Sequence, residues 1–169
     1  MLHAVQWQQL ANKLYNKRIP ILPGLIYRWI HFCYSSDLSV TTRIGKGTTL
    51  GHGGIGVVIN SDSVIGENCI IAQNVTLAKH KGGTPTIKNN VYIGHGSIVM
   101  GGVTVGNNAF VGALTLVNKD VPENAIVAGI PARILRIQTE KELEEHPCWE
   151  SIKKSLLNDI NDISPENHK

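Results

Sequence analysis

A period of six residues runs through the middle of this sequence. Aliphatic residues recur at every sixth place in three successive runs, which hold thirteen registered positions: Leu38, Ile44 and Leu50; Ile59, Ile65, Ile71 and Leu77; Ile87, Ile93, Val99, Val105, Val111 and Val117. An α-helix repeats every ~3.6 residues and a β-strand about every two, so neither element alone produces this pattern. The period indicates a repeat fold in which one small unit is stacked many times.

Two insertions interrupt the period, and a second regularity supports it. Leu50 and Ile59 are nine residues apart and Leu77 and Ile87 are ten, so three and four residues have been inserted. Ten of the thirteen positions are followed three residues later by Gly, Asn or Asp: Gly47, Gly53, Asp62, Asn68, Asn74, Asn90, Gly96, Gly102, Asn108 and Asp120. These residue types adopt a positive φ most readily, so we expect each hexad to turn a left-handed corner there.

A short strand and a corner repeated every six residues predict a parallel β-solenoid with three sides and eighteen residues per coil. The composition agrees, because aromatic residues make up only 5% of the chain and a narrow interior filled by stacked aliphatic side chains has little room for rings. The fold class is therefore mainly β. The hexads by themselves do not determine the handedness of the solenoid.

The segments on either side of the hexads have helical spacing. We expect helices over residues 4–16 and 23–34, which together form a cap on the open end of the solenoid. The predicted domains are an N-terminal helical cap at 1–36, the β-solenoid at 37–137 and a C-terminal helical tail at 138–169. In that tail, one helical face carries four apolar residues, Trp149, Ile152, Leu156 and Ile160.

Charge and cysteine content limit the classes of partner and compartment. The net charge of +3 is mild and no run of basic residues exceeds two, which argues against nucleic acid. Three cysteines without metal-ligand spacing suit reduced thiols in the cytoplasm. The apolar stretch 19–34 contains Pro20, Pro23 and Arg28 and is too short to span a bilayer, and it lacks the features of a secretion signal, but a peripheral membrane contact stays open.

Four stretches of the segment from Asp37 to Leu135 carry a family resemblance. They are Asp37 itself, His52-Gly-Gly-Ile-Gly-Val-Val-Ile59, Gln73-Asn-Val-Thr-Leu77 and Val127-Ala-Gly-Ile-Pro-Ala-Arg133. The segment resembles the hexapeptide-repeat acyltransferases, most closely their serine acetyltransferase and polysaccharide O-acetyltransferase branch. The resemblance implies a left-handed parallel β-helix, a homotrimer, acetyl-CoA as co-substrate, and direct transfer of the acetyl group.

His52 and Asp37 are the predicted catalytic residues. Acetyl transfer to an alcohol needs a base that takes the hydroxyl proton near neutral pH, and the imidazole of His52 in the first insertion meets that need. The resemblance implies that Asp37 orients the histidine and stabilises its imidazolium form. Asp37 precedes His52 by fifteen residues, close to one coil, so the spacing permits contact without requiring it.

The second insertion, 78–86, is expected to project as a loop toward a neighbouring subunit. Serine-specific relatives carry Arg-His-Pro at the end of this loop and Asp before the catalytic histidine, whereas this chain has Thr84-Pro85 and Gly51. Both departures remove charged partners for an amino acid. We therefore predict a sugar hydroxyl in surface polysaccharide biosynthesis as the acceptor, with serine O-acetylation as the alternative. Gly51, His80 and Thr84 are the predicted substrate-binding residues.

The resemblance also implies a cofactor cleft along the closing hexads and the loop. The residues assigned to it are Ala78, Lys79, His95, Ala113, Leu114, Lys119, Pro131 and Arg133. Lys119 and Arg133 are expected to meet the phosphates of CoA. Leu114 departs from the glycine usual at its place, and the role of His95 is open between cofactor contact and plain surface.

Two other classes of function are weaker candidates. A zinc enzyme of the γ-carbonic anhydrase type needs three histidines, and His52, His80 and His95 supply the number. That family pairs two of them five residues apart, whereas fifteen separate His80 from His95, so no metal is expected. The other class is a non-catalytic solenoid that only binds a partner, and the two insertions and His52 argue against it.

Overall fold

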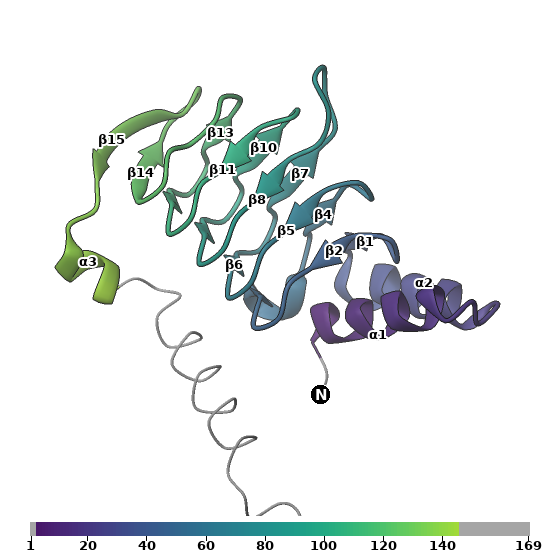
Figure 1. Cartoon of the computed structure of the whole chain (residues 1–169). Helices are drawn as coiled ribbons and strands as arrows, with labels where there is room; N and C mark the ends of the chain where they lie inside the picture. The colour runs from purple at the N-terminus through teal and green to yellow at the C-terminus, as the bar shows by residue number, and fades with distance from the viewer. Residues whose placement is uncertain (1–2, 146–169) are drawn as a thin grey trace, which may run out of the picture.

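The computed structural model describes residues 3–145, and the chain forms a parallel β-helix with helices at both ends (Figure 1). Three sheets make the three sides of the helix. The first sheet, in spatial order, contains β1 (Asp37–Leu38), β4 (Val58–Ile59), β7 (Thr76–Ala78), β10 (Ile98–Met100) and β13 (Leu116–Val117). The second contains β11 (Thr104–Val105), β8 (Thr86–Ile87), β5 (Val64–Ile65) and β2 (Arg43–Ile44).

The third sheet contains β15 (Arg133–Ile137), β14 (Ala125–Ala128), β12 (Phe110–Val111), β9 (Tyr92–Ile93), β6 (Ile70–Ile71) and β3 (Thr49–Leu50). All neighbouring strands pair in parallel except β14 and β15, which are antiparallel. The fold class predicted from the hexads, a mainly β solenoid with a short helical cap, is confirmed.

The strand register shows how the coils absorb the two insertions. Val58 pairs with Thr76, eighteen residues along the chain, as a regular coil requires. Asp37 pairs with Val58 across twenty-one residues, and Thr76 pairs with Ile98 across twenty-two. The extra residues therefore leave the walls undisturbed and lie outside the strands.

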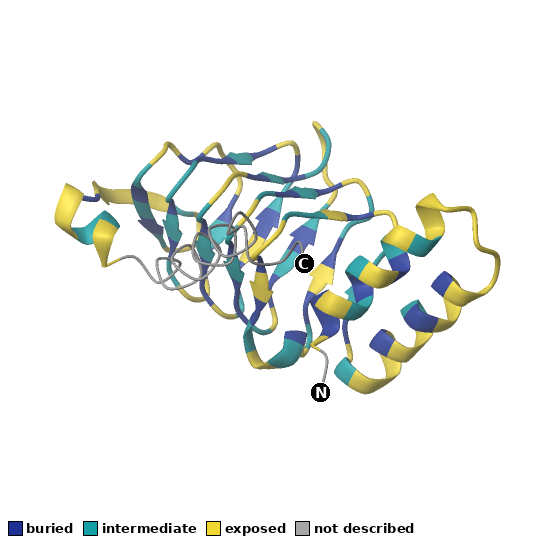
Figure 2. Cartoon of the chain, turned by 60° about the horizontal axis from the view of Figure 1, so that its bottom comes forward, coloured by how far each residue is buried: buried dark blue, intermediate teal, exposed yellow. Residues whose placement is uncertain are grey.

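The registered aliphatic side chains fill the interior. Twelve of the thirteen are buried, and Ile44, in the coil nearest the open end, is half-buried. Figure 2 shows the buried positions on the strands of successive coils. Stacked Val, Ile and Leu side chains thus form one continuous core along the axis.

The predicted left-handed corners occur at two of the three edges of the helix. Seven of the ten expected residues have a positive φ, from Gly47 to Asn108 along the chain. Asp62, Gly102 and Asp120 do not, and all three follow strands of the first sheet. At this edge Ser63 N–H donates to the carbonyl of Asn60 at 3.0 Å, which closes a β-turn whose central residues need no positive φ.

Asparagine side chains bond from coil to coil at the edge between the second and third sheets. Asn90 Nδ2 donates to Asn108 Oδ1 at 3.0 Å, and Asn108 Nδ2 donates to Asn124 Oδ1 at 2.8 Å. Each of these residues has a left-handed backbone, which asparagine tolerates well. The residue type at this corner thus serves both the turn and the stacking of the coils.

Helices α1 (Ala4–Asn16) and α2 (Leu22–Tyr34) lie side by side at the N-terminal end (Figure 1). The buried Gln8 amide donates to the carbonyls of Ser39 and Thr42, both at 2.9 Å. Asn12 Nδ2 donates to the carbonyl of Val40 at 2.7 Å. These side chains satisfy backbone groups that the first coil leaves without a preceding coil to bind them, so α1 caps the solenoid as predicted.

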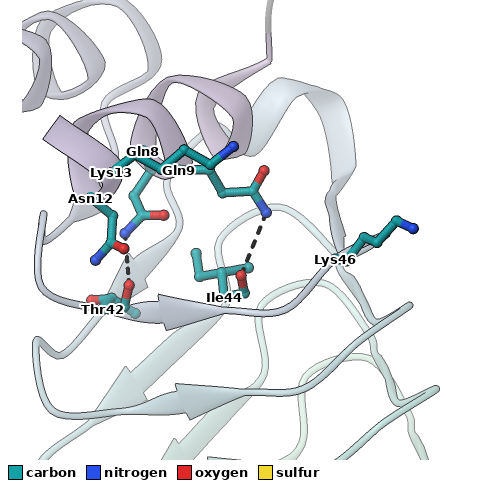
Figure 3. Close-up of a pocket in the computed structure, with 7 residues that line it drawn as sticks. All are labelled: Gln8, Gln9, Asn12, Lys13, Thr42, Ile44 and Lys46. Carbon is teal, nitrogen blue, oxygen red and sulfur yellow. Dashed lines mark hydrogen bonds between the residues drawn. The ribbon is translucent and has the colours of Figure 1, made fainter. Parts of the chain in front are cut away.

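A cavity of about 280 Å³ separates α1 from β2 (Figure 3), and the Gln9 amide reaches across it to the carbonyl of Ile44. None of the predicted site residues lines this cavity.

At the C-terminal end of the solenoid, helix α3 (Glu140–Glu144) follows β15, and Arg136 forms an ion pair with Glu142. Within residues 3–145, no helix is long and apolar enough to cross a membrane. The predicted tail helix around Trp149 and the third cysteine, Cys148, lie outside the described residues.

Candidate active site

The first insertion forms a tight turn that presents His52 to solvent. Residues Gly51–Gly54 make a short 3₁₀ turn, η1, between β3 and β4. His52 has φ 48° and ψ 39°, a left-handed conformation that is uncommon for a residue with a side chain. Its imidazole is exposed. Strained backbone of this kind persists only where the surroundings hold it, and it is often found at functional sites.

The segment that follows α2 holds this turn in place. The Ser36 hydroxyl donates to the carbonyl of Gly54, and Gly56 N–H donates to the carbonyl of Tyr34 at 3.2 Å. Position 51 is closely packed, because a Cβ on Gly51 would stand 3.1 Å from Cα of Ala72 in the next coil. A side chain at position 51 would therefore need Ala72 to shift by a few tenths of an ångström.

Asp37, the predicted partner of His52, bonds a residue that the sequence did not single out. The Tyr27 hydroxyl on α2 donates to Asp37 Oδ1 at 3.0 Å. This hydrogen bond, partial burial and the nearby negative charge raise the pKa of Tyr27. Within residues 3–145, no hydrogen bond joins Asp37 to His52. No periodic signal marks Tyr27, because the contact crosses from the helical cap to the first strand.

Tyr27→Phe tests whether this contact positions Asp37. Removing one hydrogen bond to a charged group, while the ring stays in place, is expected to lower kcat roughly three- to tenfold. The KM values for both substrates should stay near wild type, whereas a merely loosened fold would change them together with the melting temperature. Tyr15→Phe removes an exposed hydroxyl from α1 and serves as the matched control. Unchanged kcat in Tyr27→Phe would refute the positioning role.

A cavity of about 410 Å³ lies over the outer face of β1, β4 and β7. Asp37, Ala78 and Lys79 all line it, so the structure brings three predicted residues together. The Lys79 ammonium also lies 3.5 Å from the Asp62 carboxylate, at an exposed position. The cavity therefore has the Asp37 carboxylate and the Lys79 side chain in its lining, and Asp62, which pairs with that lysine, does not line it.

The second insertion projects beyond the corner of its coil as predicted (Figure 1). His80 and Gly83 exchange two backbone hydrogen bonds, of 3.1 and 3.0 Å, which close the tip of the loop. The Thr84 hydroxyl donates to the carbonyl of Asp62 at 3.2 Å. Thr84 thus fixes the base of the loop, while the His80 side chain is exposed at its tip.

A row of residues stacks at the edge between the third and first sheets. Gln73, His95 and Ala113 each stand two residues after a strand of the third sheet. Gly96 N–H donates to the Gln73 carbonyl at 3.1 Å, and Leu114 N–H donates to the His95 carbonyl at 2.9 Å. The exposed His95 and Ala113, both predicted cofactor contacts, are therefore neighbours on successive coils.

His52 holds the corresponding place after β3, but the insertion displaces it from this row. Asn74 N–H donates to the carbonyl of Ile55, three residues beyond His52. Gln73 is thus the nearest member of the row to the His52 turn, and the prediction of site residues missed it. The signal was present in the sequence, because Gln73 has the same register as His52 and His95.

Leu114 takes up a left-handed position that Asn74 and Gly96 occupy in the preceding coils. Its φ is 54°, its side chain is 64% exposed, and its Cδ2 methyl group lies over Gly96. Leu114→Gly relieves the left-handed strain and is expected to raise the free energy of unfolding by about 0.5–1 kcal/mol in urea titrations. Leu135→Gly, at an exposed site in an extended strand, should lower it instead. A loss of stability in Leu114→Gly would show that its contact with Gly96 outweighs the strain.

Two predicted phosphate-binding residues converge at the C-terminal end of the solenoid. Lys119 and Arg133 line one cavity of about 260 Å³, together with Asp120. The hydrogen bond from Ala132 N–H to the Leu116 carbonyl, 2.8 Å long, holds the returning chain against β13. Pro131 is exposed next to this cavity but does not line it. The cavity has two cations against one carboxylate and suits an anionic group.

The predicted site residues are therefore spread over one subunit. Asp37 lines the cavity over the first sheet, the turn that holds His52 is bonded to Ser36 next to Asp37, and Lys119 and Arg133 share the C-terminal cavity. Among residues 3–145, no three His, Cys, Asp or Glu side chains are grouped as a metal site would need. Cys33 and Cys69 are free thiols, and burial raises the pKa of Cys69 to about 11.

Comparisons with known proteins identify the family of this chain. A family model described as bacterial transferase hexapeptide (six repeats) matches residues 84–119. A serine acetyltransferase of Staphylococcus aureus is 33% identical over 163 residues, which cover 90% of this chain and 76% of the relative. One from Synechococcus elongatus is 35% identical over 140 residues, covering 78% of this chain and 55% of the relative. The chain thus spans about half the length of several curated relatives that it matches.

A crystal structure of serine acetyltransferase in complex with coenzyme A from Brucella abortus superposes with a TM-score of 0.75 and 30% identity, covering 80% of this chain and 56% of that one. The predicted sugar acceptor is wrong, because these relatives and structures are serine acetyltransferases and favour the alternative reading. The prediction relied on missing charges at Gly51 and Thr84, but Thr84 fixes a loop whose neighbours Lys79 and Asp62 are charged. The chain belongs to the hexapeptide-repeat acyltransferases, on the branch of the serine acetyltransferases.

Proposed function

We propose that this protein transfers the acetyl group of acetyl-CoA to the side-chain hydroxyl of serine, giving O-acetylserine and CoA. The observation that carries the proposal is His52, an exposed imidazole on a strained left-handed turn in a chain of this family. A base placed on a rigid turn is poised to reach a bound hydroxyl without reorganisation. No metal takes part in the proposed step.

The proposed reaction proceeds by direct attack. Nε2 or Nδ1 of His52 accepts the serine hydroxyl proton as the oxygen attacks the thioester carbonyl, and a tetrahedral oxyanion forms. Collapse of this intermediate breaks the carbon–sulfur bond, and the imidazolium returns its proton to the CoA thiolate. Asp37 stabilises the imidazolium electrostatically, while Tyr27 fixes the carboxylate.

The charges near the first-sheet cavity suit a zwitterionic acceptor. Lys79 offers an ammonium for the serine carboxylate, and Asp62 offers a carboxylate for its ammonium, 3.5 Å from the lysine. Both side chains are exposed, so their existing ion pair is weak and can be exchanged for substrate. In this proposal Lys79 and Asp62 bind the two charged groups of serine, which the uncharged residues Gly51 and Thr84 do not.

We infer that the working assembly is a homotrimer, because the groups of site residues are spread over one subunit and the loop 78–86 projects away from its own coils. A cleft between two solenoids can bring His52 of one subunit near the loop and cofactor groups of another. Sedimentation equilibrium should give three times the chain mass of 18.4 kDa. A monomer at micromolar concentration would refute the shared cleft.

The substrate proposal is tested by following free thiol released from acetyl-CoA. Serine should support steady turnover, and O-acetylserine should appear in equal amount by mass spectrometry. Alanine has no hydroxyl and is the matched control, while threonine tests whether an added methyl group is excluded. Absence of thiol release with serine, from a trimer that binds acetyl-CoA, would refute serine as the acceptor.

A further inference from the structure

Helix α2 has two apolar stripes, and only one of them is covered. Pro23, Ile26 and Ile30 are buried against the rest of the protein. The second stripe has the spacing i, i+3, i+7 and i+10, which places its members on one face of the helix: Leu22, Leu25, Trp29 and Phe32. All four side chains are exposed.

The exposed stripe is large for a surface feature. Phe32 is 86% exposed, Leu25 57% and Trp29 52%, and the N-cap residue Ile21 extends the stripe at its start. A hollow of about 640 Å³ runs beside the stripe. Single exposed apolar side chains are ordinary, but a contiguous set with two aromatic rings marks an interaction surface.

The charged side chains around this face are mostly basic, and a carboxylate beside it, Asp37, accepts a hydrogen bond from Tyr27 of the same helix. Residues 1–36 contain four basic residues, Lys13, Lys17, Arg18 and Arg28, and no Asp or Glu, whereas the rest of the chain has twelve basic and thirteen acidic residues. Lys17 and Arg18 lie in the turn before α2, and Arg28 borders the stripe on the helix itself. None of these three is in an ion pair with another residue in the range 3–145.

We propose that the exposed face of α2, formed by Leu22, Leu25, Trp29 and Phe32, docks on the surface of an anionic lipid bilayer. Apolar side chains enter the boundary between headgroups and acyl chains, aromatic rings favour that depth, and the surrounding cations meet the lipid phosphates and carboxylates. Thirteen residues of helix rise about 20 Å, so α2 lies in the plane of the membrane and does not cross it.

The charge pattern selects a membrane over a second copy of the chain. A symmetric pairing of two α2 faces places Lys17, Arg18 and Arg28 of one copy against the same three cations of the other. An anionic bilayer instead attracts these cations. Figure 1 places α1 and α2 at the end of the solenoid away from β14 and α3, so docking there leaves the Lys119–Arg133 cavity open to solvent.

Vesicle co-sedimentation of the full chain tests the proposal. The protein should pellet with vesicles of phosphatidylcholine containing phosphatidylserine, and much less with phosphatidylcholine alone. Trp29→Ser combined with Phe32→Ser should weaken the partition constant at least tenfold, since it removes both rings from the docked face. Arg18→Gln combined with Arg28→Gln should weaken it roughly tenfold and reduce its salt dependence.

Matched controls separate membrane docking from a general loss of structure. Leu135→Ser combined with Ile137→Ser removes two exposed apolar side chains at the other end of the solenoid and should leave partitioning unchanged. Melting temperatures of all variants should agree with wild type. Wild-type protein that stays in the supernatant with anionic vesicles would overturn the proposal, and so would binding that ignores the Trp29 and Phe32 changes. Dissociation of the homotrimer by Trp29→Ser with Phe32→Ser would assign the face to a contact between subunits and would also overturn the proposal.

Discussion

His52→Ala is expected to lower kcat for acetyl transfer to serine by roughly 10²- to 10⁴-fold, the usual share of a general base. The change removes the imidazole from an exposed turn, so the fold and the affinity for acetyl-CoA should be preserved. Steady-state kinetics together with a direct measurement of CoA binding separate these quantities. His80→Ala, an exposed histidine at the loop tip, is the matched control and should affect KM more than kcat.

The partnership of His52 with Asp37 is tested by the same kinetics. Asp37→Asn keeps the size of the side chain and should cause a smaller loss than His52→Ala. If the two residues act as a unit, the double variant should fall well short of the product of the two single effects. If the loss of kcat in the double variant equals the product of the two single losses, Asp37 does not act through His52. Near-wild-type turnover in His52→Ala would place the base elsewhere, with His80 and His95 as the next histidines to substitute.

Lys119→Ala combined with Arg133→Ala is expected to raise the KM for acetyl-CoA roughly 10- to 100-fold, with kcat little changed. Both cations line one cavity, where they are placed to form charge-assisted hydrogen bonds to a phosphate. Because this cavity is open to solvent, the effect should shrink as ionic strength rises. Initial rates across acetyl-CoA concentrations at low and high salt measure both quantities.

The control for this prediction removes equal charge elsewhere on the solenoid. Lys88→Ala combined with Arg43→Ala takes away two exposed cations from the second sheet and the turn that follows it. Its KM for acetyl-CoA should stay near wild type, which would exclude a general effect of net charge. Equal KM values in the two double variants would show that Lys119 and Arg133 do not bind the cofactor.

The hexads predicted the wall of the solenoid well because the inward direction of a side chain is a local property. In a short strand alternate side chains face opposite sides, so the aliphatic member of each hexad faces the axis whatever the other coils do. The corners were less predictable. Asp62 and Gly96 both follow the pattern, yet only Gly96 has a positive φ, because the edge after the first sheet uses a different type of turn.

The acceptor was misjudged because positions 51 and 84 were compared one at a time with those of relatives. Gly51 is closely packed against Ala72, and the Thr84 hydroxyl bonds the carbonyl of Asp62, so substrate charge is not the only influence on the residue at either position. Sequence similarity over most of the chain proved a better guide to the branch of the family than two local departures from it.

The sequence by itself determined the repeat, the three-sided wall and the places of both insertions, because each follows from residue order within one or two hexads. Only the tertiary structure decided that Tyr27 bonds Asp37, that Lys119 and Arg133 share a cavity, and that one stripe of α2 stays uncovered. The first two features bring together residues ten or more positions apart, and the third is a helix face that no other described element covers. They depend on how the insertions offset the coils and how the helices dock, which no local pattern specifies.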